Sequence, residues 1–146
     1  MAQIQRLLPL PIQTISQEGE KNMIHVVNKK SADLARYARY GAVADIMRGT
    51  ALGNPFPLTK YTRSESLVLY RKWLWEQMQK PESKAYQAML DLAEMAVIDN
   101  LCLVCCCKPL ACHGDIVKAA IEWMIVDMPQ PVYEEILDDA RTPPIN

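Results

Sequence analysis

Residues 101–115 read Leu101-Cys-Leu-Val-Cys-Cys-Cys-Lys-Pro-Leu-Ala-Cys-His-Gly-Asp115, and this stretch holds all five cysteines of the chain and one of its two histidines. It begins as an apolar run, passes a proline and leads into a segment whose apolar residues recur at helical spacing. A short apolar run bounded by turn residues is typical of a buried strand. We therefore predict a strand over residues 101–107 that delivers reactive side chains to a strand-to-helix turn.

The size and composition of the chain indicate one ordinary globular domain. It has 146 residues, half of them hydrophobic and 23% charged, with a net charge of −1 that gives no global attraction for nucleic acid. No apolar run reaches the roughly 20 residues of a membrane-spanning helix, and the N-terminus does not resemble a signal peptide. We expect a cytoplasmic protein with free or metal-bound thiols, because consecutive cysteines cannot form a regular disulfide framework.

The predicted elements alternate between strands and helices. We expect strands over 23–27, 42–47 and 101–107, and helices over 32–40, 67–78, 82–97 and 115–126, the second of them preceded by capping-box residues Thr62 and Glu65. This order favours an α/β fold with a small, mostly parallel, Rossmann-like sheet flanked by helices. The core domain is expected over residues 23–127, between irregular extensions over 1–22 and 128–146. The second extension contains a candidate short helix over 132–140.

Three polar segments follow the predicted strands, at residues 28–30, 48–56 and 107–115. Ligands of open parallel sheets bind beyond the carboxyl ends of the strands, so we expect these segments to meet there. Arg48 suits a phosphate or carboxylate, Asn54 a base or sugar edge, and Phe56 a planar ring. Taken alone, however, residues 52–56 favour a simple ordered turn. Together with the following helix, these segments supply the candidate ligand-binding residues Asn28, Lys29, Arg48, Gly53, Asn54, Phe56, Arg63 and Cys107.

The turn before the last core helix offers groups for catalysis. Cys112 lies near a helix N-terminus and near Lys108, both of which favour a thiolate. In an enzymatic version of the site Cys112 is the nucleophile or His113 the acid or base, with Asp115 orienting the imidazole. The alternative is that Cys112 packs under the loop.

The same turn also offers ligands for a metal ion. Cys105, Cys107, Cys112 and His113 form a legitimate donor set for zinc or iron, although their spacing is not that of two separated zinc knuckles. A zinc-stabilised module of this kind would contact nucleic acid through local basic residues, namely Lys29, Lys30, Arg36, Arg39, Arg63 and Arg71. We expect Cys102 and Cys106 to pack in the core.

Several short motifs together resemble a widespread bacterial and phage family catalogued as a domain of unknown function. The resemblance covers about residues 23–125 and is carried by Val26-Val-Asn-Lys29, Arg48-Gly49, residues 52–56, Arg63 with Tyr70-Arg71-Lys72-Trp73-Leu74, and residues 104–115. The last motif is the most specific. The resemblance implies that the meaningful positions are Cys105, Cys107, Cys112 and His113.

These observations favour a pocket that binds, or processes, a nucleotide or nucleotide-derived small molecule. Two other classes remain open at this point. One is the zinc-stabilised module for nucleic acid or protein. The other is an interaction protein whose proline-rich ends dock on a partner or on a second copy in a homo-oligomer.

Overall fold

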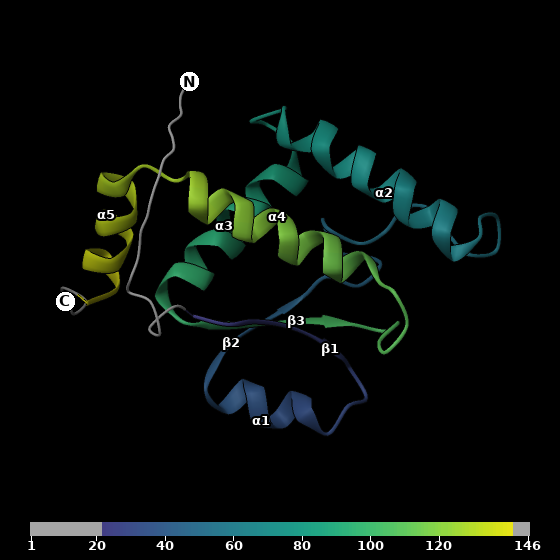
Figure 1. Cartoon of the computed structure of the whole chain (residues 1–146), viewed down its shortest axis with the longest axis horizontal. Coiled ribbons are helices and arrows are strands. Elements are labelled where there is room, and N and C mark those ends of the chain that lie inside the picture. Colours follow the sequence, from purple (N-terminus) through teal and green to yellow (C-terminus); the bar gives the residue numbers. More distant parts are fainter. Residues whose placement is uncertain (1–21, 142–146) are drawn as a thin grey trace.

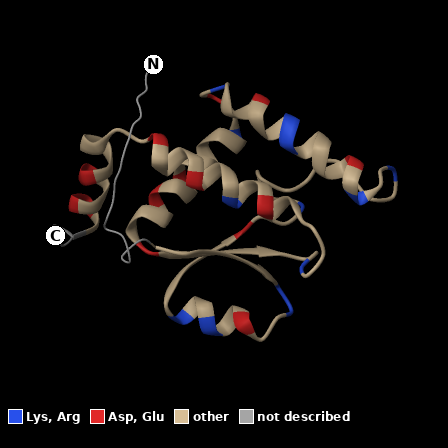
Figure 2. Cartoon of the chain, viewed as in Figure 1, with Lys and Arg blue, Asp and Glu red and all other residues tan. Residues whose placement is uncertain are grey.

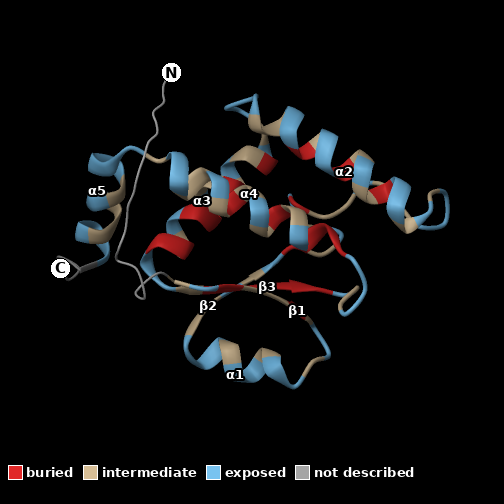
Figure 3. Ribbon diagram, in the orientation of Figure 1, coloured by how far each residue is buried: buried red, intermediate tan, exposed pale blue. Residues whose placement is uncertain are grey.

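The computed structural model describes residues 22–141, and within them three strands form one parallel sheet. Strand β1 spans Ile24–Asn28, β2 spans Gly41–Asp45 and β3 spans Asn100–Cys105. The spatial order is β1-β3-β2, and both strand pairs are parallel, as predicted. The last strand in sequence is therefore the central strand. Its residues 101–105 are all buried because it has a neighbour on each side and helices on both faces (Figure 3).

Five helices accompany the sheet in the described part of the chain. They are α1 (Asp33–Arg39), α2 (Arg63–Met78), α3 (Lys84–Ile98), α4 (His113–Asp127) and α5 (Gln130–Arg141). Helix α1 covers one face of the sheet, α3 and α4 cover the other, and α2 packs outside them (Figure 1). Helix α5 packs against α3. Nowhere in residues 22–141 is a helix both long and apolar enough to cross a membrane.

The structure describes most of the predicted C-terminal extension but only one residue of the predicted N-terminal extension. Residues 130–141 form helix α5, so this part of the C-terminal extension is regular rather than irregular, and the candidate helix over 132–140 is confirmed. Helix α5 packs against α3. This packing stabilises a helix that would be too short to form alone in water. The N-terminal extension, apart from Asn22, lies outside the described residues.

Local capping explains where the long helices begin. The Thr62 hydroxyl accepts the Glu65 N–H at 3.1 Å, and the Glu65 carboxylate accepts the Thr62 N–H at 2.9 Å, so the predicted capping box forms. Helix α3 begins after Ser83, whose hydroxyl accepts the Tyr86 N–H at 2.9 Å. These caps satisfy backbone N–H groups that would otherwise lack partners at the helix starts.

The central strand spans Asn100–Cys105 and so ends two residues earlier than predicted. It ends at Cys105 because its pairing with β1 stops at Asn28 and its pairing with β2 stops at Asp45. Face alternation therefore does not extend to Cys107, and Cys106 is exposed rather than packed in the core. The expectation for Cys102 is confirmed, since it is buried in mid-strand.

Gly114, in the first turn of α4, marks the closest approach of this helix to the sheet. A Cβ atom built there would lie 2.6 Å from Val26 Cγ1 and 3.2 Å from Ile46 Cδ1. The nearer neighbour, Val26, is a short β-branched side chain with a restricted χ1 angle, so its methyl group resists displacement. Any larger residue would therefore push α4 away from β1.

We predict that Gly114→Ala destabilises the protein. In an open helix this change would raise the free energy of unfolding by about 1 kcal/mol, but overpacking here should cost about 1–3 kcal/mol. Chemical denaturation measures the net change. Ala119→Gly, at an exposed position of the same helix, is the control. It measures the effect of exchanging alanine and glycine on helix propensity without any change in packing. A more stable Gly114→Ala variant would contradict the close packing.

Candidate functional site

A cavity of about 570 Å³ opens beyond the carboxyl ends of β2 and β3. Its walls come from the loop after β2, the first turns of α2 and the turn between β3 and α4. We call it the arginine pocket. The structure brings seven predicted site residues together in it, namely Arg48, Asn54, Phe56, Arg63, Cys107, Cys112 and His113.

The turn between β3 and α4, residues 106–112, is fastened from three neighbouring elements. The Asn28 side-chain amide donates to the Lys108 carbonyl at 2.8 Å, and the Arg63 guanidinium donates to the Ala111 carbonyl at 3.0 Å. The Lys108 ammonium pairs with the Asp115 carboxylate at 2.6 Å. Each contact satisfies a polar group of an irregular segment, so the turn has a defined shape at the pocket wall.

A chain of hydrogen bonds joins α4 to the end of β2. The Gly114 N–H donates to Cys112 Sγ at 3.3 Å, and Cys112 Sγ lies 3.6 Å from His113 Nδ1. On the other side of the ring, His113 Nε2 lies 2.6 Å from the carbonyl oxygen of Ile46. A carbonyl only accepts, so Nε2 carries a proton, and in the neutral ring Nδ1 accepts from the Cys112 thiol.

Burial holds both members of this pair uncharged. It raises the pKa of the Cys112 thiol far above its ordinary value; the Gly114 N–H opposes this rise and the Cys105 thiol adds to it. Burial also lowers the pKa of His113, against opposing effects of the Ile46 carbonyl and Asp115. Loss of hydration thus opposes the thiolate that the helix terminus and Lys108 were expected to favour at Cys112.

Asp115 does not orient His113 as predicted. Its carboxylate binds the Lys108 ammonium through one oxygen and accepts the Cys112 N–H at 3.3 Å through the other. Asp115 therefore supports the start of α4 and the turn. The thiol–imidazole pair lacks the carboxylate that a catalytic triad requires.

Asn54 is engaged within its own loop. Its side-chain oxygen accepts the Phe56 N–H at 2.9 Å, and its amide donates to the Ser66 hydroxyl at 2.8 Å. Ser66, which is buried on α2, donates in turn to the Phe56 carbonyl at 2.7 Å. The Asn54 amide thus fixes the wall of the pocket. Sequence analysis did not identify Ser66, because a lone serine in a helix carries no distinctive signal.

Gly53, a candidate ligand-binding residue, lies at a close approach of two backbone segments. A Cβ atom there would lie 2.7 Å from both Arg48 Cα and the Met47 carbonyl oxygen. The neighbouring Leu52 carbonyl accepts a hydrogen bond of 2.7 Å from the buried Tyr70 hydroxyl. The loop that carries Arg48 is therefore anchored on α2.

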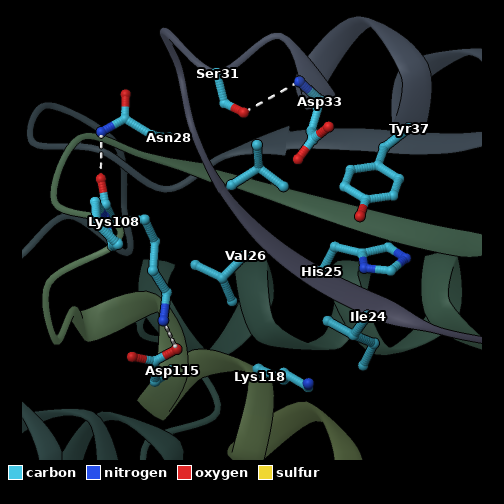
Figure 4. Close-up of a pocket in the computed structure, with 12 residues that line it drawn as sticks. Ile24, His25, Val26, Asn28, Ser31, Asp33, Tyr37, Lys108, Asp115 and Lys118 are labelled. Atoms are coloured by element: carbon cyan, nitrogen blue, oxygen red, sulfur yellow. Dashed lines mark hydrogen bonds and ion pairs between the residues drawn. The ribbon is translucent and has the colours of Figure 1, made fainter.

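Five predicted site residues do not line the arginine pocket, namely Asn28, Lys29, Gly53, Cys105 and Asp115. Asn28 and Asp115 line a second cavity of about 490 Å³ between β1, α1 and α4. Figure 4 shows the Lys108–Asp115 pair in this cavity on the α4 side of β1, away from Tyr37, which stacks on His25 at 4.0 Å. Lys29 is exposed and lines neither cavity, although its backbone N–H donates to the Cys105 carbonyl at 2.8 Å.

The predicted metal ligands are not arranged around a common point. All five cysteines are free, and residues 22–141 contain no group of three or more His, Cys, Asp or Glu side chains placed to hold a metal ion. His113 faces the Ile46 carbonyl through one ring nitrogen and Cys112 through the other.

The six basic residues of the nucleic-acid interpretation do not form one surface. Two lie just after β1, two on α1 and two on α2, and Figure 2 shows α1 and α2 on opposite sides of the sheet. Only Arg63 among them lines the arginine pocket. The other arginine that lines this pocket is Arg48. No Asp or Glu occurs among the described residues that line the cavity.

Apolar side chains complete the pocket. Phe56 stands edge-on to Tyr61 with ring centroids 5.9 Å apart. Sequence reasoning did not single out Leu58 and Leu67, which also line the cavity, because an isolated leucine in a loop or helix start carries no distinctive signal. The result is a cavity with cationic groups and an apolar wall.

Fold and cavity together define a small parallel α/β protein with an arginine-bearing pocket at the carboxyl edge of its sheet. Residues 27–123 match the family described as Domain of unknown function (DUF4326), and the chain belongs to this family. The match runs from β1 into α4 and so includes every segment that walls the arginine pocket. No curated protein and no solved structure shows significant similarity to the chain.

We predict that acid destabilises the protein through His113. Its lowered pKa means that the unfolded chain, with an ordinary value of 6.5, binds a proton before the folded protein does as the pH falls. The stability is therefore complete above about pH 6.5 and decreases as the pH falls toward the lowered pKa. His113→Gln should flatten the dependence of the melting temperature on pH in this range.

His25→Gln is the matched control for this measurement. Burial lowers the pKa of His25 as well, but this side chain is only partly buried and should account for less of the slope. If His113→Gln retains the full pH dependence of the natural sequence, a neutral buried imidazole at this position is contradicted.

Proposed function

We propose that the protein binds a nucleotide or nucleotide-derived small molecule in the arginine pocket. The observation that carries this proposal is the pairing of Arg48 and Arg63 with an apolar wall around one cavity whose described lining has no carboxylate. Such a lining favours a ligand with an anionic end and a planar, apolar end. A nucleotide combines both.

The position and size of the pocket support the same ligand class. A cavity of about 570 Å³ is within the range of small-molecule sites. It lies at the carboxyl ends of parallel strands, where Rossmann-like sheets bind nucleotides, and we extend that comparison to this sheet as part of the proposal. The free thiols fit a reducing, cytoplasmic setting, which we also propose.

The two arginines have different surroundings and therefore different roles. Arg63 is partly buried and already donates to the Ala111 carbonyl, so it presents its remaining N–H groups from a fixed position. Arg48 is exposed, and no described residue bonds its guanidinium, so it is available to close on a phosphate. Phe56, Leu58 and Leu67 offer the surface on which a base or other ring would pack.

Binding, rather than a reaction at Cys112, is the core of the proposal. Burial raises the pKa of the Cys112 thiol and lowers the pKa of His113, and both effects disfavour the thiolate–imidazolium pair of a cysteine nucleophile. We assign Cys112 and His113 to the framework of the pocket.

A thermal-shift panel tests the proposal. Nucleoside mono-, di- and triphosphates and sugar nucleotides are compared with free nucleosides and inorganic phosphate. A ligand at ten times its Kd should add about 1.4 kcal/mol of stability and raise the melting temperature by roughly 4 °C. Failure of every nucleotide to shift the melting temperature would overturn the proposal.

Arginine variants locate the binding. Arg48→Gln and Arg63→Gln should each weaken nucleotide binding by about tenfold or more, because each removes charge-assisted hydrogen bonds to the anion. Arg71→Gln, an exposed position of α2 outside the pocket, is the matched control and should bind normally. Equal losses in Arg71→Gln and Arg48→Gln would place the ligand elsewhere.

A further inference from the structure

A second concave surface lies at the opposite ends of α2 and α4. The first turns of these helices line the arginine pocket, whereas their last turns, together with α3 and α5, form a groove of about 510 Å³. We call it the tryptophan groove. Its lining is mainly apolar and includes Trp75, Met78, Leu90, Trp123, Met124, Met128, Val132 and Ile136.

Two tryptophans dominate the rim of the groove. Trp75 is 56% exposed and Trp123 is 51% exposed, and their rings meet edge to face with centroids 6.1 Å apart. Large aromatic side chains left half in water beside flexible methionines are typical of a protein-binding surface.

The charge around the groove restricts its partner. Glu94 and Asp127 line it, and no Lys or Arg occurs among its lining residues in the described part of the chain. The adjoining helix α5 adds an acidic face with Glu134 and Glu135, visible in Figure 2 as acidic ribbon beside the end of α4. A partner with cationic residues around an apolar stripe would be complementary.

We propose that the tryptophan groove binds a basic amphipathic helix of a partner protein. Grooves between helices recognise such a helix through apolar anchors at helical spacing, and Trp75 and Trp123 are the side chains that those anchors would contact. Lysines or arginines beside the stripe would face Glu94 and Asp127. A second copy docking groove to groove would instead bring acidic rims together, which is unfavourable.

Intrinsic fluorescence provides a direct test on the full chain. The probe is a tryptophan-free amphipathic peptide of about 15 residues made only of Leu and Lys, and the control is the same pattern made of Leu and Glu. The Leu/Lys peptide should give a saturable change in tryptophan emission, and the Leu/Glu peptide should not. Equal binding of both peptides would overturn the proposal.

Two kinds of variant separate docking in the groove from simple charge attraction. Trp123→Ala should weaken binding of the Leu/Lys peptide by about tenfold or more, with an unchanged circular dichroism spectrum because the side chain is half exposed. The double variant Glu94→Lys/Asp127→Lys keeps both tryptophans and should reverse the preference, so that the Leu/Glu peptide binds.

The matched control is Asp33→Lys/Asp45→Lys, on α1 and β2. It changes the net charge by the same amount as the groove variant, at positions that do not line the groove. It should retain the preference for the Leu/Lys peptide. A control that loses binding as fully as the groove variant would overturn the proposal. Self-association of the natural chain that Trp123→Ala abolishes would also overturn it, because the groove would then be an interface between copies.

Discussion

The hydrogen bond from His113 Nε2 to the carbonyl oxygen of Ile46 is the contact on which the arginine pocket depends. It is buried, 2.6 Å long, and joins residues 67 apart in sequence. One partner begins α4, and the other directly precedes the loop that carries Arg48. Without the imidazole the carbonyl would be left buried and unpaired, at a cost of about 1–3 kcal/mol, and the two walls of the cavity would lose their common anchor.

The choice of cysteine at the start of α4 follows from the same contact. Serine, threonine or aspartate is the usual residue at a helix N-cap, and a thiol is a weaker acceptor for the Gly114 N–H. What Cys112 adds is a buried S–H beside His113 Nδ1, which matches the tautomer that the Ile46 carbonyl requires. A charged pair would need hydration that this position lacks. Burial therefore favours the uncharged forms of Cys112 and His113 in the pocket wall, and the two arginines provide the charge of the pocket.

Much of this arrangement could be predicted from local pattern. The apolar residues 101–105 predicted a buried strand, and the order of periodic segments predicted a parallel sheet with polar loops at its carboxyl edge. The end of β3 could not be predicted, because it is set by where β1 and β2 stop, and so Cys106 was misplaced. The protonation state of Cys112 depends on its burial, which local pattern does not show. The partner of Asp115 is Lys108, which lies across the turn. Trp75 is exposed at the groove between α2, α3, α4 and α5. The periodicity of a single helix does not show where several helices form a groove.

The protonation state of His113 tests this account most directly. Nitrogen-15 NMR at neutral pH distinguishes a protonated ring nitrogen from one with a free lone pair, and it reports both nitrogens of each imidazole. We predict a neutral ring with the proton on Nε2 and an unprotonated Nδ1. A ring protonated on both nitrogens, or only on Nδ1, would contradict the bond to Ile46 and the neutral thiol–imidazole pair on which the pocket is built.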